Sequence, residues 1–173
     1  YRTRGIDLAT GVTYDVEDLA NAYTIAPYRD GSLLAEIYNP EIDTAVKLVS
    51  YNPADGSTTQ LGEVAIDNYT PLIGLAYDPS ADAIYCVKSG EICQVDLQSG
   101  TVGEGITEMP IEAYSSAPGC ILDGGYYAFC SEGAAVRNLD PAQKAQSKLR
   151  INDSFWSESV NAAYYRFANA HGD

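Results

Sequence analysis

The sequence predicts an all-β fold of repeated four-stranded units, and a recurring phrase, its spacing and the composition support this. The phrase is an apolar residue, Asp or Asn, three further residues and Gly. Its second position falls at Asp7, Asn52, Asp96 and, in a copy without the Gly, Asp140, at intervals of 45, 44 and 44 residues. A fixed period of this length is typical of repeat architectures. The 14 Tyr and 15 Gly favour strands and turns. We therefore expect a β-propeller-like fold with about four blades of four antiparallel strands.

The clearest blade is expected over about residues 71–105. Short apolar runs at 72–77, 83–87, 91–96 and 101–104 are separated by turn-forming residues such as Asp78-Pro79 and Ser89-Gly90. Pro cannot donate to a strand ladder, and Asp, Ser and Gly favour turns, so each run should end there. Four short strands with a turn between each pair are the pattern of one blade.

The rest of the chain is expected to follow this plan within a single domain, residues 1–173. Further blades are expected at about 26–64 and 117–151, and partial blades at 1–12 and 154–168. Residues 1–12 match the later strands of a blade, and 154–168 have the composition of earlier ones. Residues 16–28 fit no strand pattern well, and residues 15–22 are expected to form a helical turn or a loop.

Three ways of completing the ring follow from these partial blades. The chain is part of a longer propeller, closes alone with four blades, or joins a second copy, because closure protects strand edges that would otherwise self-associate. The alternative architecture is a non-propeller antiparallel sheet protein whose turn spacing is coincidental.

The charge balance limits the partners. The formal net charge is −14, from 24 acidic and 10 basic residues. Nucleic acids and anionic membrane surfaces are bound by Lys and Arg patches, so neither is expected as a partner. No stretch approaches 18 apolar residues, so no membrane insertion is expected. The acidity also has a simpler interpretation, which is solubility.

Three phrases carry a resemblance to a known family: residues 74–79 (GLAYDP), Ile84-Tyr85 and residues 95–100 (VDLQSG). They resemble bacterial extracellular β-propeller repeats of the YVTN or WD-repeat-like kind. The resemblance covers residues 4–151 as a pattern and is strongest over 72–103, while Lys144 departs from the Gly of the pattern. It implies a propeller fold and an extracellular or cell-surface location. It implies no single activity, because propellers include lactonases, lyases, dehydrogenases and interaction modules.

No catalytic residues are assigned. The chain has one His, His171, so neither a multi-His metal site nor a Ser–His–Asp triad is expected. Loops rich in Asp and Asn, such as residues 52–56 and 78–82, offer oxygen ligands for calcium, but none has the EF-hand spacing. Capping of turns is the alternative role of these side chains. We expect no cofactor and assign no metal ligand, with calcium the one ion that remains open.

Two of the four cysteines are candidates for a disulfide. Cys86 and Cys93 flank an expected strand–turn–strand, which would place them opposite each other. A cross-strand disulfide and a pair of buried free thiols are both consistent with this position.

Aromatic side chains are the candidate ligand-binding residues, because amphipathic rings are favoured at carbohydrate and peptide contacts. The candidates are Tyr114, Tyr126, Tyr127, Trp156, Tyr164 and Tyr165. Packing between blades is their alternative role. We expect a non-catalytic, exported or cell-surface module that binds a protein or carbohydrate ligand. The competing class is a carboxylate- or calcium-dependent propeller enzyme, of the lactonase or polysaccharide-lyase type, acting at the central channel.

Overall fold

The computed structural model describes residues 2–37, 44–66, 72–108, 119–130, 133–140 and 147–150. They form three four-stranded antiparallel sheets and one two-stranded hairpin, and the only helices among them are two 3₁₀ turns. The predicted all-β, propeller-like fold is therefore confirmed. The partial blade expected at residues 154–168 lies outside the described residues.

Each sheet follows chain order, as in a propeller blade. The first blade contains β3 (Ala22–Pro27), β4 (Leu33–Ile37), β5 (Ala45–Tyr51) and β6 (Thr58–Ala65). The second contains β7 (Ile73–Asp78), β8 (Ala83–Lys88), β9 (Glu91–Asp96) and β10 (Thr101–Glu108). The third contains β11 (Gly119–Leu122), β12 (Gly125–Cys130), β13 (Gly133–Asn138) and β14 (Ser147–Arg150). The hairpin of β1 (Arg4–Ile6) and β2 (Thr13–Asp15) precedes them, and η1 (Glu17–Leu19) and η2 (Arg29–Gly31) are the 3₁₀ turns.

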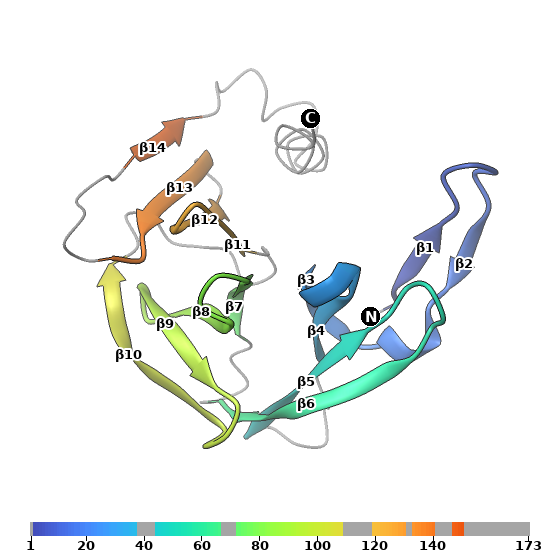
Figure 1. Cartoon of the computed structure of the whole chain (residues 1–173), viewed down its shortest axis with the longest axis horizontal. Coiled ribbons are helices and arrows are strands. Elements are labelled where there is room, and N and C mark those ends of the chain that lie inside the picture. The colour runs from blue at the N-terminus through green and yellow to red at the C-terminus, as the bar shows by residue number, and fades with distance from the viewer. Residues whose placement is uncertain are drawn as a thin grey trace.

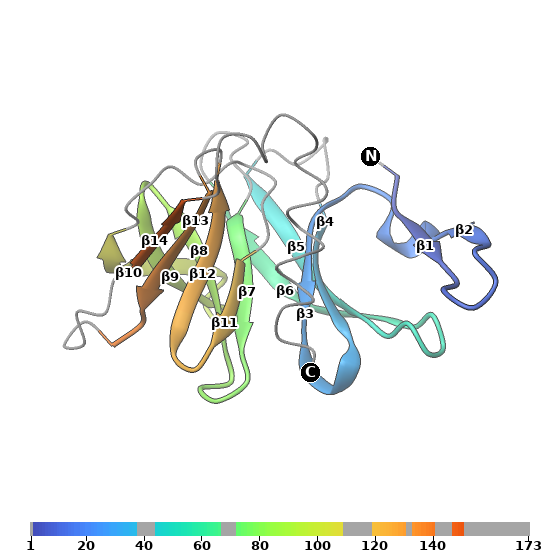
Figure 2. The same cartoon turned by 90° about the horizontal axis from the view of Figure 1, so that it is seen from above.

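The blades stand side by side with their first strands innermost. β7 contacts both β3 and β11, whereas β6 and β10 lie at the outer rim (Figure 1). The turns β3–β4, β7–β8 and β11–β12 all project from the same end of the molecule (Figure 2). We call this the turn end, and side chains from neighbouring blades can meet there.

The core lies between the blades. One apolar cluster, which includes Leu34, Leu48 and Leu75, fills the space between the first and second blades. A second, around Ile92 and Tyr126, joins the second blade to the third. The far face of the first blade is covered in part by Leu19 of η1 and neighbouring residues. Blades stack because each sheet buries its apolar faces against its neighbours.

The recurring phrase forms the same turn in three places. The carboxylate or amide oxygen of Asp7, Asn52 and Asp96 accepts a hydrogen bond from the backbone N–H two residues later, at 2.8, 3.0 and 2.8 Å. The glycine that closes each turn has φ of 71°, 73° and 67°, a conformation that favours Gly. In the first two blades the phrase thus connects the third and fourth strands, and at Asp7 it connects β1 and β2.

One strand was not expected. β3 occupies residues 22–27, within the segment 16–28 for which the sequence analysis found no strand pattern. The helical turn is present, as η1, but the strand shows no apolar alternation because its inward positions are Thr24 and Ala26. An inward Thr and Ala give no hydrophobic period of two, which is the usual sign of a half-buried strand.

Candidate functional site

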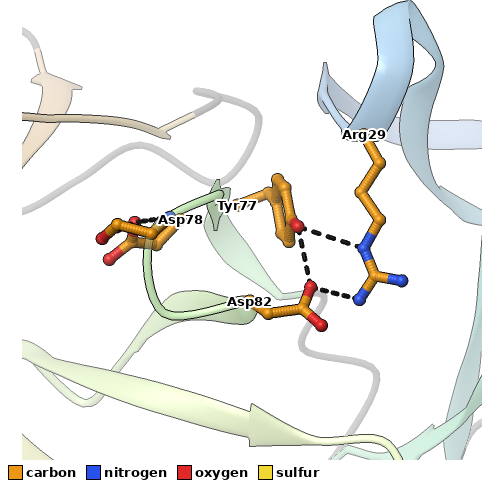
Figure 3. A network of polar contacts seen from close by, with 5 residues as sticks. Arg29, Tyr77, Asp78 and Asp82 are labelled. Atoms are coloured by element: carbon orange, nitrogen blue, oxygen red, sulfur yellow. Dashed lines mark hydrogen bonds and ion pairs between the residues drawn. The ribbon is translucent and has the colours of Figure 1, made fainter.

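Two blades meet at the turn end in a cluster of aromatic and charged side chains. Tyr28 and Arg29 come from the β3–β4 turn, and Tyr77 and Asp82 come from the end of β7 and the turn after it. Figure 3 shows Arg29 reaching across from the first blade to Tyr77 and Asp82. We call these four residues the inter-blade cluster.

The polar contacts of the cluster form a closed triangle. The Arg29 Nε–H donates to the Tyr77 hydroxyl at 3.0 Å, and that hydroxyl donates to Asp82 Oδ1 at 2.7 Å. Arg29 Nη2 also forms an ion pair with Asp82 Oδ1. The Tyr28 and Tyr77 rings pack edge to face with their centroids 4.6 Å apart. The Arg29 guanidinium carbon lies 5.3 and 5.6 Å from the two ring centroids, within the range of cation–π attraction.

Turn chemistry places these side chains. Asp78 Oδ1 accepts from the backbone N–H and the hydroxyl of Ser80, at 2.8 and 2.7 Å, which fixes the start of the β7–β8 turn. Asp82 then adopts φ of 51°, the left-handed conformation that Asp tolerates better than most residues. Asp30, beside Arg29, has a similar φ of 53°. The two turns therefore bring Arg29 and Asp82 together at the Tyr77 hydroxyl.

The cluster is charged and open to solvent. The side chains of Arg29 and Asp82 are 49% and 62% exposed. The Tyr77 hydroxyl and then the guanidinium hold the pKa of the Asp82 carboxyl below its usual range. Partial desolvation and the hydrogen bond to Asp82 raise the pKa of Tyr77. At neutral pH the cluster thus carries one cation, one anion and two neutral phenols, a set that suits recognition of polar ligands.

A second polar feature is buried between the first two blades. The Glu36 carboxyl is inaccessible to solvent, and its Oε1 accepts from the Leu72 backbone N–H at 3.0 Å. Its Oε2 and the Thr24 hydroxyl are buried without a hydrogen-bond partner among the described residues. Burial raises the pKa of Glu36 to about 8. The carboxyl is therefore mostly protonated at neutral pH.

The cysteine pair lies close to Glu36. Cys86 and Cys93 are ladder partners across the β8–β9 hairpin, as expected from the sequence, and the turn between them is formed by Ser89 and Gly90. Both are buried free thiols in the structure. Burial, followed by the proximity of Cys93 and Glu36, raises the pKa of Cys86 to about 12.

The structure describes two of the six aromatic residues proposed as ligand contacts. Tyr126 is fully buried, and its hydroxyl donates to the Gly74 backbone carbonyl, which favours the packing role for this ring. Tyr127 is partly buried. The remaining four, Tyr114, Trp156, Tyr164 and Tyr165, lie outside the described residues. A ligand-binding role for the six stays a prediction.

Sequence reasoning did not single out the inter-blade cluster. It interpreted Asp78 and Asp82 as turn residues and did not consider Arg29. Arg29 and Asp82 lie just before β4 and β8, the second strands of successive blades. Charged residues in equivalent turns of neighbouring repeats were therefore a usable signal.

The described residues were searched for metal-binding groups and for membrane-spanning helices. Within them, no three or more His, Cys, Asp or Glu side chains gather in a group that could hold a metal ion. In the same part of the chain, no helix has the length and apolar character needed to cross a membrane.

Comparisons with known proteins support the fold class. No protein-family model matches the chain, and no curated protein matches it. Among solved structures, it is similar to a gluconolactonase from Xanthomonas campestris, with 17% identity and a TM-score of 0.50 over 79% of this chain and 52% of the other. It is also similar to the extracellular domain of a putative hybrid two-component system from B. thetaiotaomicron, with 16% identity and a TM-score of 0.45 over 87% and 20% of the two chains. The chain thus spans about half of the gluconolactonase and a fifth of the sensor domain. At these identities the likeness to the gluconolactonase shows a shared propeller-type fold, and the narrower kinship with YVTN or WD-like repeats stays a prediction.

Proposed function

We propose that this chain belongs to a non-catalytic, exported or cell-surface propeller module that binds a protein or carbohydrate ligand at the turn end. The observation that carries the proposal is the inter-blade cluster, in which two blades each contribute an aromatic ring and a charged side chain to one solvent-open surface. Recognition residues are often found on turns held by a rigid scaffold. Here the scaffold is a pair of packed blades.

The chemistry of the cluster favours a carbohydrate. A sugar hydroxyl both donates and accepts hydrogen bonds, so neighbouring hydroxyls can accept from Arg29 and donate to Asp82. Tyr28, which is partly exposed, offers an amphipathic ring beside these charges. Because guanidinium and carboxylate already hold each other in place, little side-chain entropy is lost on binding.

An array of neutral and acidic oligosaccharides, with a peptide array beside it, tests the proposal. We expect a glycan ligand whose affinity falls at least about tenfold in Arg29→Gln and in Asp82→Asn, because each removes one charged hydrogen-bonding group. Arg2→Gln is the matched control, since Arg2 forms an exposed ion pair with Asp15 on the N-terminal hairpin. Binding to peptides but not to oligosaccharides would identify a protein, and not a carbohydrate, as the ligand. If nothing binds on either array, or if affinity falls equally in all three variants, the inter-blade cluster is not the ligand-binding site.

The competing class is an enzyme that depends on a carboxylate or on calcium. Calcium titration followed by thermal unfolding separates it from the binding module, because an ion that binds the folded state raises the melting temperature. A large rise that a chelator reverses, together with turnover of a lactone or polysaccharide, would displace the binding module. We expect neither.

A further inference from the structure

Glu36 lies between the same two blades that form the inter-blade cluster. It belongs to β4 of the first blade, and its side chain is fully buried. Its Oε1 accepts a hydrogen bond from the backbone N–H of Leu72, the residue just before β7 of the second blade. Its Oε2 is buried without a partner among the described residues. A neutral carboxyl is tolerated in such a place, whereas an ionised one is poorly compensated by a single hydrogen bond.

The buried carboxyl and the inter-blade cluster are held by the same two hairpins. Glu36 and Tyr28 belong to the β3–β4 hairpin and the turn within it, and Tyr77 lies near the end of β7, the strand that Leu72 precedes. Both tyrosine rings pack on the apolar cluster between the blades, to which Leu34 and Leu72 also belong. Because protein interiors are close-packed, a change in the spacing of the two blades at Glu36 is transmitted to the rings.

The groups around Glu36 provide no compensating positive charge. Thr24 of β3 and Leu48 of β5 are its ladder neighbours, and neither carries a charge. Cys86 of β8 is close to Glu36, and burial raises the pKa of this thiol to about 12, so the thiol stays neutral. Among the described residues no cation pairs with the Glu36 carboxyl. The other ionisable side chains on the surrounding strands are Tyr23 of β3, Lys47 of β5, Glu63 of β6, Asp78 at the far end of β7, Lys88 of β8, and Glu91 and Cys93 of β9.

We propose that Glu36 makes the inter-blade cluster sensitive to pH: its neutral carboxyl keeps the first two blades packed, and its ionisation in mildly alkaline solution opens the cluster. A buried carboxylate needs hydration, and water reaches it when the two blades separate locally. The contacts of Arg29 with Tyr77 and Asp82 span the two blades, so this separation breaks them (Figure 3).

The consequence for binding, which rests on the proposed function, follows from the direction of the pKa shift. Burial raises the pKa of Glu36 to about 8, so the carboxyl is neutral below this pH and ionised above it. A ligand that needs the intact cluster should therefore bind less tightly as pH rises through about 8. By the reciprocity of coupled equilibria, such a ligand would also help Glu36 to keep its proton.

Nuclear Overhauser effects between the Tyr28 and Tyr77 rings test the proposal on the full chain without any ligand. Ring C–H protons do not exchange with water, and the pKa of each phenol is raised above 10.0, so both rings report on the cluster up to about pH 9.5. From about pH 6 to about pH 9.5 the inter-ring NOE should fall at least about twofold, with the midpoint of the Glu36 Cδ titration.

Two controls accompany this measurement. Glu36→Gln keeps the shape of the side chain and the oxygen that accepts from Leu72 but cannot ionise, so its inter-ring NOE should not change with pH. Cross-strand NOEs between Tyr85 and Gln94, which are ladder partners within the second blade, should persist in both proteins.

Each other outcome overturns the proposal. A constant inter-ring NOE while Glu36 titrates would show that the carboxylate is accommodated without separation of the blades. A Glu36 midpoint near 4.5 would place the carboxyl in water. An equal decline in Glu36→Gln would assign the change to another group, and loss of the Tyr85–Gln94 NOEs at the same pH would indicate global unfolding. The two midpoints are measured on the unaltered protein, so they decide even if Glu36→Gln does not fold. Failure of the arrays to yield a ligand would remove the proposed function and leave this result unchanged.

Discussion

Thr24 and Glu36 face each other across the β3–β4 ladder, each with a buried oxygen that has no partner among the described residues. The ladder register places Ile73 and Val87 at the same positions in the second blade. The first blade thus buries a hydroxyl and a carboxyl where its neighbour has two aliphatic side chains, Val87 buried and Ile73 partly buried. Burying a polar group without a full set of hydrogen bonds costs about 1–3 kcal/mol, so the pair is a cost to the fold.

The Glu36 carboxyl should make stability depend on pH. Its pKa is raised from 4.5 to about 8 in the folded state, so the folded protein binds more protons than the unfolded chain between these values. The free energy of unfolding should therefore fall as pH rises from about 4.5 to about 8, by up to about 1.4 kcal/mol per pH unit from this group. Urea unfolding across this range should show a steeper decline in the parent than in Glu36→Gln, which cannot ionise. If the free energy of unfolding depends on pH in the same way in both proteins, the folded state does not hold the Glu36 proton in this pH range.

Thr24→Val should stabilise the protein. The substitution removes a buried hydroxyl that has no partner among the described residues and keeps the shape of the side chain. We expect a gain of about 1 kcal/mol in the free energy of unfolding, measured by chemical denaturation. Thr13→Val, at an exposed position of β2, is the control and should change stability by less than about 0.5 kcal/mol. A loss of stability in Thr24→Val would mean that the hydroxyl has a partner in solution.

The features that sequence predicted are local, and those it missed depend on which blades are neighbours. The turns at Asp7, Asn52 and Asp96 follow from bonds between residues two apart, so the phrase alone indicates them. The contact between Arg29 and Asp82 spans 53 positions and exists only because two blades stack. No pattern within one repeat contains that relationship.

β3 shows a second limit of sequence reasoning. Its strand pattern is hidden because Thr24 occupies an inward position, and a polar residue there removes the alternation that identifies strands. The same residue that conceals the strand is the one that departs from the aliphatic row of the second blade. A strand that the sequence pattern misses can therefore mark a position where one repeat differs from the others.

Gly100 and Gly56 occupy equivalent turns but should tolerate alanine differently. Both have positive φ, 67° and 73°, so Ala should cost about 1–2 kcal/mol at either from backbone strain. A Cβ at Gly100 would lie 2.7 Å from the Glu63 backbone oxygen, whereas nothing lies within 4 Å at Gly56. We expect Gly100→Ala to lose about a further 1–3 kcal/mol, measured by denaturant unfolding. Equal losses would show that the turn of the second blade can move away from β6.

Cys86 and Cys93 should be inert until the protein unfolds. Both thiols are buried, and burial raises the pKa of each, so little of the reactive thiolate forms at about pH 8. Alkylation of the unreduced protein followed by peptide mass mapping should label neither residue in the folded state and both in denaturant. The partly exposed Cys120 provides the internal comparison and should react first among these three. If Cys86 and Cys93 stay unlabelled in denaturant and react only after reduction, the two ladder partners form a disulfide in solution.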